Sequence, residues 1–192
     1  MITLARKTQN AKRKTQRELG ILMIKNNVTL LQKTQAGIAD GTLQNPIVVQ
    51  VYSENQGNFH SVIKMRNHSI ESDQPSGFRG QNKGPKPSEL VLAALAACQE
   101  TTWRIYAEVL GITIDKISIE IKGIQDLRGF MNIDKNIPAG FQKIEGDILI
   151  ESSSPKEELE KLKNLVDEHC PVLDDLTRIV PVSFNLSLKS GK

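Results

Sequence analysis

Hydrophobic and polar residues alternate in several short segments of the chain, and this spacing predicts β-strands. The first two predicted strands cover residues 47–52 and 59–65, with Asn55–Gly57 as the turn between them. A third short strand is expected at residues 68–71. The same alternation returns later in the chain, over residues 112–122, 143–151 and 180–188.

A long helix is predicted between Pro87 and Gly111. Proline suits the first position of a helix, and glycine is a typical residue just past the last one. Residues 90–97 are apolar on every side, so we expect the first half of this helix to be central and buried all round. One face of the helix is defined by residues spaced alternately four and three apart, namely Val91, Leu95, Cys98, Thr102, Ile105 and Val109.

A second helix is predicted from Ser154 to the neighbourhood of Cys170, because Pro171 disfavours the helical conformation at the residue before it. Its apolar face carries Leu159, Leu162, Leu165 and Val166. The segment 74–87 is rich in Gly, Pro, Ser and Asn and is typical of a loop. The order of strands, long helix, two strands, helix and strand predicts an α+β fold, most simply two helices on antiparallel sheet.

Composition agrees with one globular domain plus an appendage, since 39% of the 192 residues are hydrophobic and 24% are charged. Of the 25 basic and 22 acidic residues, eight basic and one acidic lie in residues 1–33, which leaves 17 basic and 21 acidic in the remainder. We therefore expect a basic N-terminal extension over residues 1–45 and a folded domain over 46–192. No aromatic or glycine-rich recognition motif accompanies the basic charges, so a solvated extension is favoured over nucleic-acid binding.

The N-terminus has no apolar stretch of the kind that directs secretion, and the longest apolar run, residues 90–98, is too short to cross a bilayer. We therefore expect a cytoplasmic protein without a membrane anchor. In a reducing compartment its two cysteines have three plausible roles, which are apolar packing, metal binding and redox chemistry. Zinc is disfavoured because the chain has three His residues and no CxxC arrangement.

Cys98 and Cys170 are the candidate functional residues, and we interpret them as two halves of one thiol redox site. Packing is the alternative for each, because a free cysteine behaves as a small hydrophobe. Cys170 stands between His169 and Pro171. These neighbours favour a functional site over a packing role for Cys170. A thiol reacts as the thiolate, so the fold must bring an Arg, Lys or His side chain to Cys98, which sits in mid-helix.

Two motifs resemble a known family. The first is GPKPSELVLAALAAC, which runs from Gly84 to Cys98 and continues with Arg104–Ala107, and the second is His169–Val172, HCPV. Together, and at this spacing, they resemble the OsmC/Ohr family of organic hydroperoxide reductases. The resemblance covers residues 47–188 and leaves the basic extension outside.

The resemblance implies a two-cysteine peroxidase that needs no metal or organic cofactor. By analogy, Cys98 would attack an organic hydroperoxide and become a sulfenic acid, and Cys170 would resolve it as a disulfide. A thiol or dithiol reductant would then restore both thiols. The family's fold implies an intertwined homodimer in which antiparallel sheets enclose two central helices, with active sites at the subunit interface.

The family also uses an Arg to activate the thiolate and a Glu to orient that Arg. The matching candidates here are Arg79 and Glu89, although the motif register falls one residue earlier in each case, on Phe78 and Ser88. Two other functions remain open on the same scaffold. One is a redox-sensing or binding protein without enzyme activity, and the other is a sulfur or acyl carrier that uses Cys98.

Overall fold

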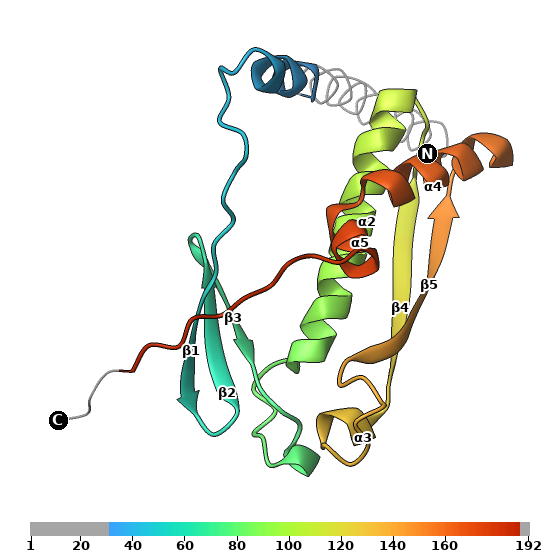
Figure 1. Cartoon of the computed structure of the whole chain (residues 1–192). Helices are drawn as coiled ribbons and strands as arrows, with labels where there is room; N and C mark the ends of the chain where they lie inside the picture. The colour runs from blue at the N-terminus through green and yellow to red at the C-terminus, as the bar shows by residue number, and fades with distance from the viewer. Residues whose placement is uncertain (1–30, 189–192) are drawn as a thin grey trace, which may run out of the picture.

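The computed structural model describes residues 31–188, and the basic segment 1–30 lies outside the described residues. A helix over residues 31–39 is followed by an extended segment that leads into the domain (Figure 1). The elements that follow are β1 Tyr52–Gly57, β2 His60–Met65, β3 His68–Ser72, the short 3-10 helix η1 Ser76–Phe78, α2 Pro87–Leu110, β4 Lys116–Gln125, α3 Leu127–Phe130, β5 Phe141–Glu151, α4 Lys156–His169 and α5 Pro171–Thr177.

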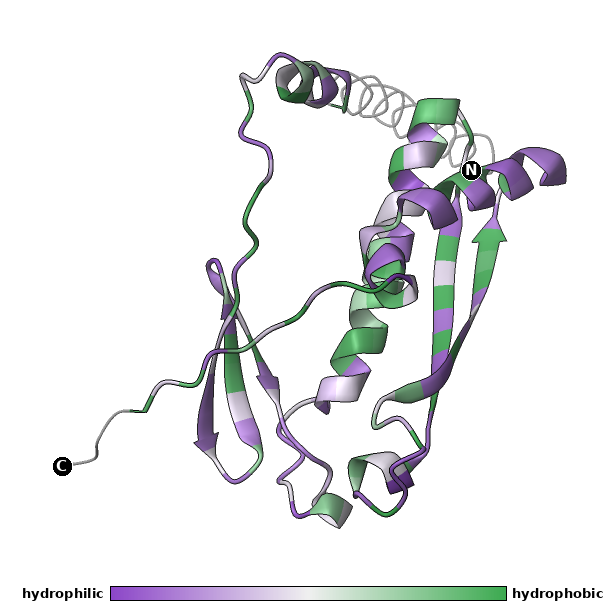
Figure 2. Cartoon of the chain, viewed as in Figure 1, coloured by the Kyte–Doolittle hydropathy of each residue, from purple (hydrophilic) through white to green (hydrophobic). Residues whose placement is uncertain are grey.

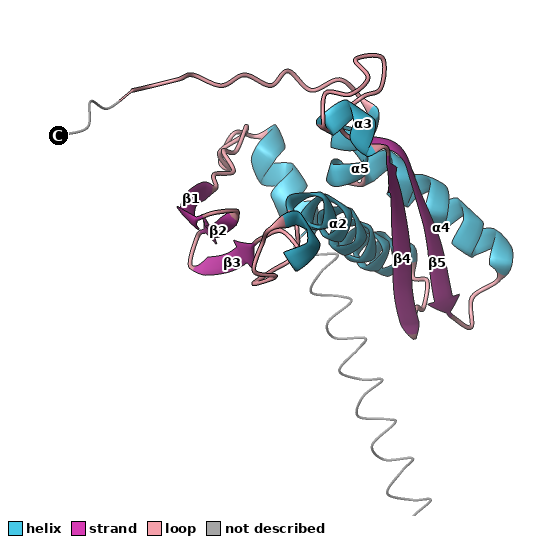
Figure 3. Cartoon of the chain, turned by 90° about the horizontal axis from the view of Figure 1, so that it is seen from below, coloured by secondary structure: helices cyan, strands magenta, loops and turns pink. Residues whose placement is uncertain are grey.

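The strands form two antiparallel sheets, which confirms the predicted α+β class. β1, β2 and β3 pair in chain order, and β4 pairs with β5 along nearly its whole length. The long helix α2 lies between the two sheets in both views (Figure 1, Figure 3). Apolar and polar residues alternate along β4, as expected for a strand with one buried face (Figure 2).

The bounds of both predicted helices are confirmed. Pro87 is the first residue of α2, and Gly111 ends the helix in the left-handed conformation, with φ 69°. α4 ends at His169, directly before Cys170 and Pro171. The predicted strands at 143–151 and 68–71 are confirmed almost to the residue, whereas the strand predicted at 112–122 is β4 at Lys116–Gln125. The short helices α3 and α5 were not expected from the pattern.

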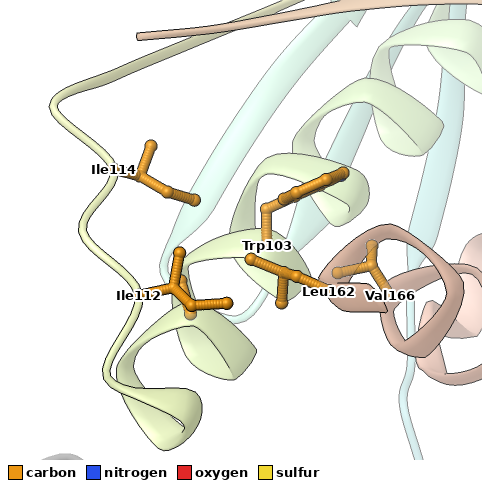
Figure 4. Close-up of a cluster of buried hydrophobic side chains, with 6 residues drawn as sticks. Trp103, Ile112, Ile114, Leu162 and Val166 are labelled. Atoms are coloured by element: carbon orange, nitrogen blue, oxygen red, sulfur yellow. The ribbon is translucent and has the colours of Figure 1, made fainter. Parts of the chain in front are cut away.

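The hydrophobic core lies where the second half of α2 meets α4. Its buried residues are Trp103, Ala107, Ile112, Ile114, Leu162 and Val166 (Figure 4). Ile112 and Ile114 belong to the segment that leads into β4, and they are buried although they precede the strand. This cluster fixes α4 along α2, and α2 also packs against β4 and α5.

The prediction that the first half of α2 is buried all round is wrong for a single chain. Leu95 is its only fully buried residue in the described structure, and Val91, Ala93, Ala94 and Ala97 are exposed. The reason is that α4, α5 and β4 cover one side of α2, and an apolar helix surface needs a neighbour on every side to be fully buried.

Two predicted strands are also wrong within one chain. Residues 47–51 and 180–188 are extended but unpaired, and their apolar side chains are exposed, with Val48 at 86% and Phe184 at 94% of full exposure. Alternation of apolar and polar residues leads to a strand only where a neighbouring strand pairs with it through backbone hydrogen bonds. The first hairpin is shifted as well, because Asn55–Gly57 is part of β1 and the turn falls on Asn58 and Phe59.

Truncating Leu162 tests the α2–α4 contact, because this side chain is completely buried in the core. We expect Leu162→Ala to lower the free energy of unfolding by about 2–5 kcal/mol, through lost burial and the cavity left behind. Urea unfolding followed by circular dichroism measures the loss. Leu149→Ala, on the exposed face of β5, is the matched control and should change stability by less than about 0.5 kcal/mol. Equal losses for both variants would contradict this location of the core.

Candidate thiol site

Cys98 and Cys170 meet although they lie 72 residues apart in the chain. The two sulfur atoms are 3.2 Å apart, in hydrogen-bond geometry with the Cys170 thiol as donor. Both cysteines are in the free thiol form. Cys170 has no exposed surface, whereas Cys98 is partly buried. A disulfide has an S–S distance of about 2.05 Å, so a small movement of either side chain would bring the sulfurs to bonding distance.

Cys170 is held by the junction between two helices. Its backbone N–H donates to the carbonyl of Val166 and so closes the last turn of α4. Its φ of −78° and ψ of 109° then turn the chain out of the helix, and Pro171 begins α5. The carbonyl of Cys170 accepts the N–H of Asp174 in the first turn of α5. The thiol therefore sits at a fixed bend rather than on a free loop.

Burial is the main influence on the Cys170 thiol and raises its pKa, because the thiolate loses solvation. The backbone N–H of Leu173 acts in the opposite direction, the neighbouring Cys98 raises the pKa further, and the Thr102 hydroxyl lowers it. The net pKa of Cys170 lies above its usual value. Among the described residues, no Lys, Arg or His contributes to this shift, so one chain gives Cys170 no cationic partner.

His169, which the sequence places next to Cys170, interacts with other groups. Its Nδ1 lies 2.9 Å from the carbonyl oxygen of Leu165, and its ring lies 5.1 Å from the ring of Tyr106. The imidazole is thus engaged by the end of α4 and by α2. Although His169 adjoins Cys170 in the sequence, the contacts recorded for its imidazole in the described structure are with Leu165 and Tyr106 and not with the two thiols.

Arg79 lies near the opposite end of α2 from the core. It follows η1 in the left-handed conformation, with φ 64°, and its side chain is exposed. It borders a cavity of about 580 Å³ together with Phe78, Phe130, Ser88 and other residues, and neither cysteine lines this cavity. Within one chain Arg79 is therefore separate from the thiols.

The loop that carries Arg79 is organised by Asp73. This carboxylate is buried and accepts the backbone N–H groups of Gln74, Gln81 and Lys83. Burial acts to raise the pKa of Asp73, but the three hydrogen bonds outweigh it and hold the pKa below the usual value. The loop is thus a defined structure despite its glycine-rich and polar composition.

Glu89 stabilises the start of α2. Its carboxylate accepts the backbone N–H of Lys86 at 3.0 Å, which is the reciprocal half of a capping box. Nine residues separate it from Cys98, which corresponds to ~13 Å along a helix axis. The structure therefore brings Cys98 and Cys170 together and leaves Arg79 and Glu89 of the same chain away from them.

Thr102 and Gln99 are neighbours of the site whose roles were not predicted. Thr102 belongs to the predicted face of α2, and its hydroxyl donates to the carbonyl of Cys98 at 2.8 Å. Gln99 is only 6% exposed, and its Oε1 is buried without a hydrogen-bond partner in the described structure. A glutamine among apolar helix residues was the available signal, but its burial depends on the packing of α4 and α5.

The fold and the paired thiols define an α+β protein with a two-cysteine site, and the comparisons with known proteins identify its family. The family model for OsmC-like protein matches residues 80–185, more than half of the chain, and the protein therefore belongs to the OsmC-like family. No curated protein matches the chain.

Solved structures share the fold at low sequence identity. An OsmC-like protein from Mycoplasma pneumoniae is 20% identical and has a TM-score of 0.61, over 68% of this chain and 88% of that one. An OsmC-like protein of unknown function from Vibrio cholerae is 12% identical, with a TM-score of 0.56 over 68% and 94%. An organic hydroperoxide resistance protein OsmC from Legionella pneumophila is 19% identical, with a TM-score of 0.51 over 70% and 92%.

Between residues 31 and 188, no helix has the length and apolar composition needed to cross a membrane. In the same range, His, Cys, Asp and Glu side chains nowhere gather in groups of three or more that would suit a metal ion.

Alkylation of the reduced protein should distinguish the two thiols. We expect iodoacetamide to label Cys98 before Cys170, because Cys170 is fully buried and its raised pKa leaves less thiolate at a given pH. Labelling of Cys170 should need a higher pH than an ordinary thiol does. Peptide mapping by mass spectrometry measures both rates, and protein unfolded in urea is the control in which the two rates converge. Faster labelling of Cys170 at neutral pH would contradict this order.

Proposed function

We propose that the protein is a thiol-dependent peroxidase that reduces organic hydroperoxides through Cys98 and Cys170. The observation that carries the proposal is the 3.2 Å separation of the two sulfur atoms. Membership of the OsmC-like family supports it, as does the likeness in fold to a protein named for organic hydroperoxide resistance. The free thiols suit a reducing compartment, and we place the protein in the cytoplasm.

The proposed reaction has three steps. The Cys98 thiolate attacks the O–O bond of a hydroperoxide, ROOH, which becomes the alcohol ROH after taking up a proton, while Cys98 becomes a sulfenic acid. The Cys170 thiol then attacks the sulfenic sulfur, and the products are the Cys98–Cys170 disulfide and water. A dithiol reductant exchanges with this disulfide, is itself oxidised, and returns both cysteines to thiols.

The different burial of the two cysteines supports different roles for them. Cys98 is partly exposed and can meet a small substrate, whereas Cys170 has no exposed surface and can react only with a group already inside the protein. The raised pKa of Cys170 leaves less of its thiolate at a given pH, so Cys170 is the less suited of the two to attack a hydroperoxide from solution. The proposal therefore makes Cys98 the peroxidatic residue and Cys170 the resolving residue.

Activation of Cys98 requires a positive charge, and we propose that a second copy of the chain supplies it. Arg79 and Glu89 lie near the start of α2, too far along the helix to reach Cys98 of the same chain. If the exposed first halves of two α2 helices pack against each other in opposite directions, the start of one lies beside the middle of the other. Arg79 of one subunit then faces Cys98 of its partner.

Three exposed apolar surfaces support such a homodimer. They are the uncovered side of the first half of α2, the unpaired segment 47–51 and the unpaired segment 180–188. Both segments have strand alternation and lack a strand partner among the residues of one chain that the structure describes. In the proposed intertwined dimer, each adds to a sheet of the assembly, and the two α2 helices become central between the sheets. An edge strand left open with apolar side chains is otherwise an aggregation hazard.

The first test measures consumption of cumene hydroperoxide by the purified protein with a dithiol reductant. We expect Cys98→Ser to abolish the activity. Cys170→Ser should still consume one equivalent of hydroperoxide, but it should stop at the sulfenic acid, which dimedone traps for mass spectrometry. Ser153→Ala, at an exposed serine outside the thiol pair, is the control and should keep full activity. Turnover that survives in Cys98→Ser would eliminate the proposed mechanism.

The second test asks whether Arg79 acts across subunits. Arg79→Ala and Cys98→Ser homodimers should each be inactive. Because a heterodimer of the two variants has one intact site of two, it should recover about half of the wild-type activity per dimer. Two different affinity tags allow the co-expressed heterodimer to be purified. An inactive heterodimer would show that Arg79 does not serve the partner's thiol.

A redox sensor on the same scaffold is the second candidate function. It is favoured by the position of Arg79, which borders a cavity that neither cysteine lines and therefore does not activate Cys98 within one chain. A sensor forms the same disulfide on exposure to hydroperoxide. It differs in that no dithiol supports repeated turnover, so the cumene hydroperoxide assay separates the two functions.

A further inference from the structure

One buried carboxylate closes the base of the loop that carries Arg79. Asp73 directly follows β3 and is 1% exposed. Its Oδ1 accepts the backbone N–H of Gln74 at 2.8 Å, and its Oδ2 accepts those of Gln81 at 2.9 Å and Lys83 at 3.3 Å. The first donor precedes η1 and the other two follow it. The carboxylate therefore joins the two ends of the segment that contains Arg79.

The backbone at the base of this loop is also packed closely against itself. The N–H of Gly80 donates to the carbonyl of Pro75, and that of Asn82 donates to the carbonyl of Gln74. A Cβ atom at Gly80 would overlap the carbonyl oxygen of Gln74, so any side chain at this position would force the two ends apart. The loop thus has one closed arrangement, which depends on the carboxylate and on the glycine.

The backbone of Arg79 is held in a conformation that arginine disfavours. Its φ of 64° lies in the left-handed region, which glycine adopts without steric cost. A residue with a side chain stays in this conformation only where its surroundings fix it, and such residues cluster at functional sites. The ion pairs of residues 31–188 do not include Arg79. The direction of its side chain therefore depends on the loop backbone rather than on a carboxylate partner.

We propose that Asp73 is a positioning residue, which fixes the backbone on both sides of Arg79 so that the guanidinium is presented to Cys98 of the partner subunit. This inference rests on the proposed function and on the role proposed there for Arg79. Asp73 contacts backbone N–H groups and no thiol, so it acts through Arg79. Precise placement matters because a displacement of about 1 Å can remove much of a group's effect on a reaction.

Asp73→Asn tests the proposal with the smallest change of shape. The side chain keeps its size and one acceptor oxygen, but the new amide nitrogen is a donor and cannot accept the N–H groups that the replaced oxygen accepts. At least one of the three hydrogen bonds to the carboxylate is lost, and the loop loosens. The core of the protein lies at the other end of α2 and should stay folded.

The measurement is the rate at which iodoacetamide labels Cys98 in the full-length protein, followed by peptide mapping. At pH 7 we expect Arg79→Ala to slow labelling at least about tenfold, because an adjacent cation shifts the ionisation of an acid by about one unit or more. Asp73→Asn should slow it about five- to tenfold, as the loss of a hydrogen bond to a charged acceptor gives. Above about pH 10 the thiol ionises without a cation, so all three rates should converge.

The double variant Asp73→Asn/Arg79→Ala separates positioning from general damage. Because Asp73 acts only through Arg79, the double variant should be labelled at the rate of Arg79→Ala alone. Losses that multiply, or that persist at high pH, would show a general structural role and overturn the inference. Asp40→Asn is the matched control, since it alters an exposed carboxylate that accepts the N–H of Thr42, and it should be labelled at the wild-type rate.

Gly80→Ala provides a second way to open the loop, and it removes no charge. It should slow labelling at pH 7 as Asp73→Asn does, which keeps the proposal testable if the asparagine variant folds poorly. Slow labelling of Arg79→Ala with wild-type rates for Asp73→Asn and Gly80→Ala would overturn the inference alone. A wild-type rate for Arg79→Ala would overturn the role of Arg79 and the inference with it. Dependence of labelling on both residues, in a protein without hydroperoxide turnover, would support the positioning role while the peroxidase proposal fails.

Discussion

The packing of α4 against the second half of α2 determines the chemistry that the protein can perform. Leu162 and Val166 are completely buried against the cluster that contains Trp103 and Ala107. This contact sets the position of α4 along α2, and the residue that follows α4 is Cys170. The sulfur atoms of Cys98 and Cys170 come from distant parts of the chain. They meet because the apolar contact between the two helices fixes α4 at one position along α2.

The proline after Cys170 converts this contact into a defined site. α4 cannot continue through Pro171, so the backbone bends at Cys170 and α5 starts in a new direction. The bend buries the thiol completely while leaving it 3.2 Å from Cys98. Burial also raises the pKa of Cys170, so the geometry that brings the two sulfurs together also makes Cys170 the less reactive thiol toward external reagents.

Local residue chemistry made α2 and α4 predictable, since Pro87, Gly111 and Pro171 act on the backbone wherever they occur. The meeting of Cys98 and Cys170 could be anticipated from two family motifs, although no local rule gives the distance between them. The predictions of strands at 47–51 and 180–188 were wrong for a different reason. Their alternation is real, but a strand needs a partner to bond with, and residues 31–188 of one chain do not provide it. The burial of Gln99 could not be predicted from the sequence either. It depends on the packing of α5, a helix of seven residues with no strong periodic pattern.

The length of α2 explains why the site is divided between distant parts of the chain. At 24 residues the helix is ~36 Å long, so a side chain at its start cannot act on a thiol near its middle. The core covers the second half of the helix, and the first half keeps exposed alanine and valine residues that no described part of the same chain covers. Small side chains allow two helices to approach closely, and their exposure is costly only while no second helix is present. In the proposed dimer, the surface that is uncovered in a monomer would bring the start of one α2 helix, and with it Arg79, to Cys98 of the other subunit.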